Sequence, residues 1–430
     1  EEMGNPASMK AQMAEAKLCR AYAMFMMANT FCMAWNPDMA DEYLGLPYPT
    51  KPETSVDVKH KRGTLRELYD KINKDIEDAL PDVDDNLYTV PKYHFNRAAA
   101  YAFAARFNLY YLNDDKCIEY ANKVLGNDPK TVMRDFEPYT QFGAMDIGNR
   151  YIKTSENANL LLVSYYSILG RTFQGQFPRF NHNSSMAQYE TFWAEAPWGA
   201  GSSSNTLYYA NMLYGSNPCV IFPKMLEQFE YTDKVSGIGY AHVVRLEFWA
   251  EETLLCRAEA KLFLGDIDGC VADLIIWDAA RQKLGAGESY SFKPMTRELI
   301  EKFYAVDPGD KKYKGFGIVK PIHIDEVCPS DKYSLTDDKL PYMQCIQHFR
   351  RIETVHNGMR FFDIKRLGLS ITHHFGRFNT PYTLKTLDAR YAMQIPSEVI
   401  SAGMDANVRP VVSKKSEATV EASGSYILVK

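Results

Sequence analysis

Apolar residues recur at helical spacing along the first third of the chain. From Thr64 onward, positions three and four residues apart form one apolar stripe, which would face a core: Leu65, Leu68, Tyr69, Ile72, Ile76, Ala79 and Leu80. Thr64 and Glu67 have the spacing of a capping box, which marks the start of this helix. Because Pro81 cannot continue a helix, we predict that it ends there and that residues 82–92 form a loop.

Two helical hairpins with one shared pattern are predicted further along the chain. They cover residues 96–112 with 116–125, and residues 247–264 with 269–280. Aligned by hand, Ala105 matches Ala258 and Asn113 matches Asp266, and both pairs are 153 residues apart. The unit resembles a tetratricopeptide hairpin, whose copies stack into a concave surface.

The first of these hairpins departs from the repeat pattern at its turn. Leu112 stands where the turn usually has glycine, so we expect a distorted hairpin. A third copy of the first helix is indicated at residues 15–31, and one more helix is predicted at residues 360–368.

The hairpins are separated by stretches without helical periodicity. A strand-like run at residues 159–168 is followed by a segment rich in Gly, Ser, Asn, Trp and Tyr. Long irregular segments in a compact protein are usually functional. We therefore predict a mostly α fold with a few short strands, as a single domain over residues 1–430. Its hairpin repeats would lie at about 10–130 and 245–285, and its ligand-binding insertions at about 140–240 and 285–345.

Composition places the chain among globular proteins and excludes several partners. Hydrophobic residues make up 46% and charged residues 24% of the 430 residues, with a net charge of −5. No cluster of Lys and Arg is dense enough to follow a phosphate backbone, so we expect no nucleic acid partner. The longest apolar run falls far short of the roughly 20 residues that cross a bilayer. The eight cysteines are scattered without a Cys-x-x-Cys pair, which favours neither a zinc site nor a disulfide scaffold.

We find no motif that would mark a catalytic centre, a metal site or a cofactor site. The chain has no glycine-rich phosphate loop, no nucleophile elbow and no zinc-binding His-Glu-x-x-His pattern. The adjacent His373 and His374 would point in different directions on a regular element. Glu190 and Glu195 flank Trp193, and two acids could hydrolyse a glycosidic bond, but such acids are usually solvated. We therefore expect no enzyme activity, no metal and no cofactor.

Aromatic residues are abundant, with 28 Tyr and 23 Phe, and many gather in the irregular segment with asparagines. Flat aromatic faces stack on the apolar faces of sugar rings, and amides bind their hydroxyl groups. This mixture favours a neutral glycan, bound by rings that project into solvent. The candidate residues are Trp35, Asn36, Trp193, Trp198, Tyr208 and Tyr209. The alternative is that Trp193 or Trp198 packs the loop onto the hairpins.

Several motifs in a fixed order resemble the SusD/RagB family of nutrient-binding outer-membrane lipoproteins of Bacteroidetes. They are the segments 14–22 and 45–50, the helix ending at Pro81, the helix from Asn96, the Ala258-Glu259-Ala260 repeat, Gly358 to Gly368, and Ile395-Pro396. The resemblance covers nearly the whole chain.

The resemblance implies a non-catalytic binding protein at the cell surface. Family members are tethered to the outer membrane by a lipidated N-terminal cysteine. They pass oligosaccharides to a SusC-like TonB-dependent transporter. We expect this function and this extracellular location here, with a lipid anchor and signal that lie outside the given sequence. The alternatives are peptide capture, as in the RagB-like branch, and a protein-interaction scaffold that uses the concave hairpin surface.

Overall fold

The computed structural model describes residues 6–55, 59–171, 182–198, 212–214, 219–282, 294–304, 322, 335–375 and 380–409. The chain forms two compact units. Unit 1 comprises Glu1–Asp82, Ile322–Thr336 and Phe361–Lys430, and unit 2 comprises Val83–Pro321 and Asp337–Arg360. The single domain over residues 1–430 stays a prediction.

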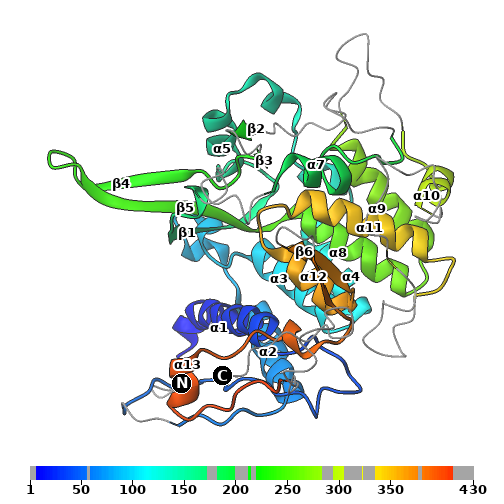
Figure 1. The fold of residues 1–430 in the computed structure, drawn as a ribbon. Coiled ribbons are helices and arrows are strands. Elements are labelled where there is room, and N and C mark those ends of the chain that lie inside the picture. The colour runs from blue at the N-terminus through cyan, green and yellow to red at the C-terminus, as the bar shows by residue number, and fades with distance from the viewer. Residues whose placement is uncertain are drawn as a thin grey trace. The chain divides into compact units, whose positions relative to one another are not determined.

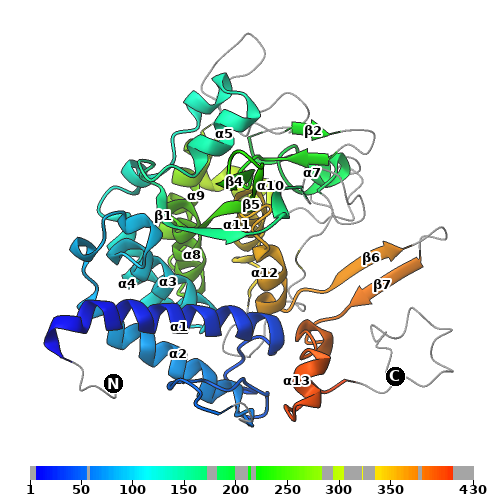
Figure 2. The ribbon, with the colours of Figure 1, turned by 90° about the vertical axis from the view of Figure 1, so that its left-hand side faces the viewer.

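Unit 1 is built on two packed helices, α1 (Lys10–Phe31) and α2 (Leu65–Ala79) (Figure 2). The predicted capping box is confirmed: the Thr64 hydroxyl accepts from the Glu67 amide at 3.2 Å, and the Glu67 carboxylate accepts from the Thr64 amide at 3.3 Å. A short 3-10 turn at Leu80–Asp82 ends the helix, as Pro81 predicts. The unit also contains the hairpin of β6 (Ile371–Phe375) and β7 (Thr380–Leu384), and the short helix α13 (Ser397–Ser401).

The segment around the predicted helix at residues 360–368 forms α12 (Met359–Leu367). In unit 1 its Lys365 ammonium donates to the backbone carbonyls of Asn29 and Cys32, at the end of α1. The Asp363 carboxylate accepts from Arg366 one turn further along, at 2.9 Å. These contacts give the basic and acidic residues of this helix a structural role.

Unit 2 contains the two predicted hairpins, which are confirmed. They are α3 (Arg97–Tyr110) with α4 (Asp114–Leu125), and α8 (Ala250–Phe263) with α9 (Ile267–Ala279). The first residues of corresponding helices keep the separation of 153 residues found in the sequence. Since α4 packs against α8, the two copies form one continuous helical layer.

The expected distortion of the first hairpin is wrong. Leu112 adopts a φ of 61°, and Gly265, at the same position of the second hairpin, has a φ of 85°. The backbone therefore makes the same left-handed turn with leucine as with glycine. The strain stays at Leu112 instead of spreading into the helices.

Several helices of unit 2 lie in stretches for which the sequence predicted no helix. They are α5 (Ala144–Tyr151), α6 (Leu169–Arg171), α7 (Ser184–Glu190), α10 (Arg297–Tyr304) and α11 (Leu340–Glu353). Short 3-10 turns at Asp85–Leu87, Pro91–Tyr93, Pro129–Val132 and Glu137–Gln141 lie in the connecting segments. The predicted strand-like end at residues 425–429 lies outside the described residues.

A three-stranded antiparallel sheet in the order β1-β5-β4 adjoins these helices. Its strands are β1 (Asn159–Tyr166), β4 (Glu227–Asp233) and β5 (Ile238–Trp249), and a small second sheet pairs β2 (Met212–Tyr214) with β3 (Cys219–Ile221). The strand predicted at residues 159–168 is thus confirmed, and the β4–β5 hairpin is new. Within unit 2 this hairpin projects away from the helices (Figure 1).

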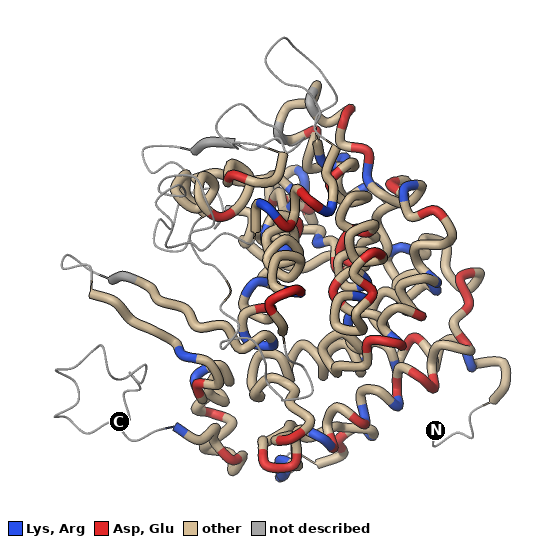
Figure 3. Tube along the Cα trace, turned by 90° about the vertical axis from the view of Figure 1, so that its right-hand side faces the viewer, with Lys and Arg blue, Asp and Glu red and all other residues tan. Residues whose placement is uncertain are grey.

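Charged residues of both signs are spread over the helices (Figure 3). Among the described residues, no helix combines the length and apolarity that crossing a bilayer requires.

Candidate functional site

The projecting hairpin is held at its base by a buried carboxylate. Strand β5 passes directly into α8 at Trp249 and Ala250, both of which are buried. The indole N–H of Trp249 donates to the Glu353 carboxylate at 2.8 Å, and that of Trp277 donates to its second oxygen at 2.9 Å. Arg281 also donates to this carboxylate, at 2.6 Å. Burial alone would raise the pKa of Glu353, but Arg281 and Lys224 outweigh it, and the net effect lowers the pKa.

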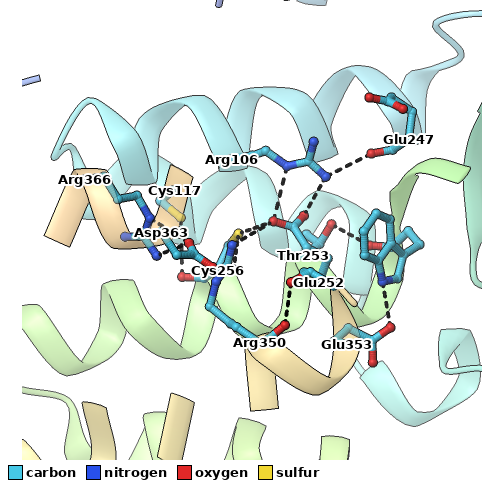
Figure 4. A network of polar contacts seen from close by, with 12 residues as sticks. Arg106, Cys117, Glu247, Glu252, Thr253, Cys256, Arg350, Glu353, Asp363 and Arg366 are labelled. Carbon is cyan, nitrogen blue, oxygen red and sulfur yellow. Dashed lines mark hydrogen bonds and ion pairs between the residues drawn. The ribbon is translucent and has the colours of Figure 1, made fainter. Parts of the chain in front are cut away.

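A second buried carboxylate fixes the start of α8 against the first hairpin (Figure 4). Arg106 of α3 donates to Glu252 at 3.0 Å and to the backbone carbonyl of Glu247 at 2.9 Å. Arg350 of α11 reaches the same carboxylate at 3.5 Å. Because all these groups are buried, they position the end of β5 rigidly.

The outer part of this sheet carries most of the exposed aromatic side chains. Among the described residues eight aromatic side chains are exposed, and five of them lie on the three strands: Tyr165, Tyr166, Phe229, Tyr231 and Tyr240. We call this region, residues 164–166 with 227–242, the aromatic arm. The sequence offered one signal for it, the alternation of Phe229 and Tyr231 with polar residues before the Gly237 turn, which is typical of a strand.

The register of the strands places the rings on two opposite faces. Tyr166 pairs with His242, and Tyr240 pairs with Glu230, so these tyrosines share one face. Phe229 pairs with Ala241, and Tyr231 pairs with Gly239, which places both rings on the other face. A Cβ atom on Gly239 would come within 2.7 Å of the Phe229 ring, so this ring covers the glycine.

The arm is acidic. Glu227, Glu230 and Asp233 lie on β4, and Lys234 in the adjoining turn is the one basic residue of segment 227–238. The Asp233 carboxylate accepts from the amide and the hydroxyl of Ser236, at 3.1 and 2.6 Å, and these hydrogen bonds lower the pKa of Asp233. Gly237 completes the turn with a φ of 66°.

Two of the predicted ligand residues, Trp35 and Asn36, are buried in unit 1. The Trp35 ring stacks on Tyr69 of α2 with 5.0 Å between centroids, and the Arg66 guanidinium lies 5.4 Å from it. The Asn36 side chain accepts a hydrogen bond from the Asp38 amide at 2.9 Å and shapes the loop. The expectation that Trp35 projects into solvent is therefore wrong, because its apolar ring fills the space over α2.

The expectation of a projecting ring is also wrong for Trp198. Its side chain is only 3% exposed and packs on α11, with 5.6 Å between its ring and that of Phe349. This is the alternative in which the tryptophan holds the loop onto the helices. Trp193 is half-buried, and its amide donates to the Ala187 carbonyl at 2.8 Å. Tyr208 and Tyr209 lie outside the described residues.

Neutral histidines pack around the segment that carries Trp198. The His182 ring lies 2.7 Å from the Val220 carbonyl and 2.8 Å from the Thr191 hydroxyl. The His348 ring lies 6.2 Å from the Trp198 ring. Burial lowers the pKa of His182 and of His348 to about 4, and burial lowers the pKa of His356 well below its usual value.

The acids that flank Trp193 do not form a pair of free carboxylates. Glu190 makes an ion pair with Arg351 of α11, and both side chains are mostly buried. In the part of the chain that the structure describes, no group of three His, Cys, Asp or Glu side chains is arranged to hold a metal ion.

The fold and the arm define a class of protein: a helical-hairpin protein with a projecting aromatic surface. The solved structures that it resembles share one fold. A SusD superfamily protein from Bacteroides thetaiotaomicron VPI-5482 matches with a TM-score of 0.56 and 17% identity, over 95% of this chain and 81% of that chain. A SusD-like carbohydrate binding protein from Bacteroides vulgatus ATCC 8482 matches with a TM-score of 0.54 and 16% identity, over 93% and 77%. A SusD-like protein from Bacteroides fragilis NCTC 9343 matches with a TM-score of 0.51 and 16% identity, over 93% and 80%.

The sequence supports the same assignment at its N-terminal end. Residues 1–109 match the SusD-like family model described as "Starch-binding associating with outer membrane". No curated protein matches the sequence. The fold thus resembles that of SusD superfamily proteins over nearly the whole chain, and residues 1–109 resemble the SusD-like family in sequence, which confirms the predicted resemblance and the mostly α fold.

Proposed function

We propose that this protein captures neutral oligosaccharides at the cell surface and passes them to a SusC-like TonB-dependent transporter in the outer membrane. In this proposal it is a non-catalytic, lipid-anchored binding protein. The observation that carries the proposal is the gathering of five exposed aromatic rings on one projecting sheet. Such rings offer the flat apolar faces on which sugars stack.

Similar proteins support this proposal. One of the solved structures that share the fold is described as a SusD-like carbohydrate binding protein, and the matching family model is described as starch-binding. The model's description also includes association with the outer membrane, which supports the proposed location.

Peptide capture is the second candidate, and β4 favours it. This strand lies at the edge of the three-stranded sheet, and it carries exposed acidic residues that would attract Lys and Arg. An extended basic peptide could add to this edge as a further strand.

Affinity gel electrophoresis distinguishes the two candidates. Gels containing starch, xylan, pectin or a host glycan would be compared with gels lacking polysaccharide, and binding of casein peptides would be measured in parallel. We expect retardation by at least one neutral polysaccharide. Binding of peptides alone would replace the proposed function with peptide capture, and binding of neither class would refute both.

A further inference from the structure

Four of the five exposed rings of the aromatic arm form two separate pairs, and the fifth, Tyr165, lies on the same face as Phe229 and Tyr231. The Tyr166 and Tyr240 rings lie 5.7 Å apart between centroids, with an angle of 67° between their planes. The Phe229 and Tyr231 rings lie 4.8 Å apart, with an angle of 66°. Since the strand register places the two pairs on opposite faces, the body of the sheet separates them.

We propose that the aromatic arm is a two-sided glycan site, with one sugar-binding subsite at the Tyr166–Tyr240 pair and another at the Phe229–Tyr231 pair. This inference rests on the proposed function and names the part of the molecule that performs it. Its ligand class is a soluble, neutral polysaccharide whose chain bends.

The angle between the rings determines which form of glycan fits. Two planes that meet at a steep angle cannot both lie flat on one planar surface, so neither pair suits a crystalline polysaccharide. One ring of each pair stacks on the apolar face of a sugar, and the other contacts the edge of the same sugar or the next sugar along a bending chain.

The surroundings of the pairs fit this role. All four rings are exposed, at 77% for Tyr166, 58% for Tyr240, 43% for Phe229 and 53% for Tyr231. On the Tyr166–Tyr240 face, the Glu230 carboxylate and the Gln228 amide, which also donates to Asn149 at 3.1 Å, are groups that could bind sugar hydroxyls. On the other face, Gly239 and Ala241 are too small to cover the rings.

The charge of the arm selects against acidic glycans. Three carboxylates on β4 and one ammonium at the turn give segment 227–238 a negative charge. Uronic acids and sulfated sugars would therefore be repelled at low ionic strength, whereas a neutral chain would not.

Opposite faces also predict how affinity depends on chain length. A trisaccharide is too short to reach round the sheet, so each face binds its own molecule. A long chain can engage both faces, and the second contact is then intramolecular, which raises affinity by roughly 10²- to 10⁴-fold where the geometry allows it.

Fluorine NMR of protein labelled with 3-fluorotyrosine tests the two-sided site. The resonances of Tyr240 and Tyr231 report one face each, and they are assigned from the single variants Tyr240→Ala and Tyr231→Ala. We expect maltotriose, or the trisaccharide of the neutral polysaccharide that is retained in gels, to shift both resonances. In Tyr166→Ala/Tyr240→Ala, the Tyr231 resonance would still shift with unchanged affinity.

The polysaccharide gives the complementary measurement. Either double variant, Tyr166→Ala/Tyr240→Ala or Phe229→Ala/Tyr231→Ala, should weaken polysaccharide binding at least tenfold, and the fourfold variant should abolish it. Tyr382→Ala, an exposed tyrosine on the β6–β7 hairpin, is the matched control and should bind normally. Thermal unfolding of each variant would verify that it is folded.

The outcomes separate this inference from the proposed function. A shift of only one resonance, or full polysaccharide binding by a folded fourfold variant, would overturn the two-sided arm and leave glycan capture standing. Failure of the unaltered protein to bind any glycan would overturn both.

Discussion

The turn of the first hairpin shows strain at a single residue. Leu112 has a φ of 61°, a conformation that costs an L-residue with a side chain roughly 1–2 kcal/mol. The neighbouring copy of the repeat avoids this cost with Gly265. The same turn in two sequence contexts therefore allows an internal comparison.

We predict opposite effects of exchanging the two residues. Leu112→Gly should raise the free energy of unfolding by about 1 kcal/mol, because the strain is removed. Gly265→Leu should lower it by roughly 1–2 kcal/mol. A Cβ atom at Gly265 would meet no atom within 4 Å, so that loss would come from the backbone alone. Urea unfolding measures both, and a destabilising Leu112→Gly would contradict this explanation.

For individual residues, the sequence did not show which of its aromatic side chains are exposed. Rings that project into solvent were expected at Trp35 and Trp198, but these rings are buried, whereas five exposed rings lie on the aromatic arm. A segment without periodicity does not indicate which side chains face solvent. Trp198 is buried because it packs on α11, which is distant in sequence. The local sequence pattern around Trp198 does not indicate that contact.

Among the elements, helices with a clear apolar stripe or with the repeat pattern were predicted, whereas α11, which has neither, was not. Helix α2 has a clear apolar stripe and a capping box, and the repeat located α3, α4, α8 and α9. Helix α11 is buried over almost its whole circumference, and its polar side chains contact other buried groups. Its sequence therefore shows no separate polar face. Strands β4 and β5 of the arm were not predicted for a different reason, because both of their faces are exposed near the tip.

The buried carboxylate of Glu353, on α11 at the base of the arm, should contribute strongly to stability. Glu353→Gln removes the charge that pairs with Arg281 and one of the two acceptors used by Trp249 and Trp277. We expect a loss of roughly 3–5 kcal/mol in the free energy of unfolding, as for other broken buried ion pairs.

An exposed ion pair is the matched control for this variant. Glu301 pairs with Arg297 on the surface of α10 at 2.9 Å and also accepts from the Tyr342 hydroxyl, an acceptor role that the glutamine oxygen of Glu301→Gln retains. Glu301→Gln should change the free energy of unfolding by less than about 1 kcal/mol in the same urea titration. Equal losses of stability in the two variants would show that burial does not make the Glu353 ion pair more important for stability than an exposed pair.

For the molecule as a whole, buried histidines contribute to the response of stability to acid. The folded-state pKa of His182 and of His348 is about 4, below the ordinary value of 6.5, so the unfolded chain binds more protons between these values. The contribution of these two histidines to the free energy of unfolding should therefore be largest above pH 6.5. It should fall as the pH drops from about 6.5 to about 4.

Two measurements check this prediction. Urea titrations at a series of pH values would give the fall in stability, and two-dimensional NMR of the histidine rings would give their pKa values directly. Titration of both rings near pH 6.5 in the folded protein would contradict the account.

The uninterrupted passage from β5 into α8 has a mechanical consequence. A polymer pulling on the tip of the arm would load the β1–β5 ladder along its strands, so that its hydrogen bonds share the force instead of opening one after another. Tension would then reach α8 and the carboxylates that clamp it, with no flexible joint in between. The arm would thus resist traction from a large, slowly diffusing chain bound at its tip.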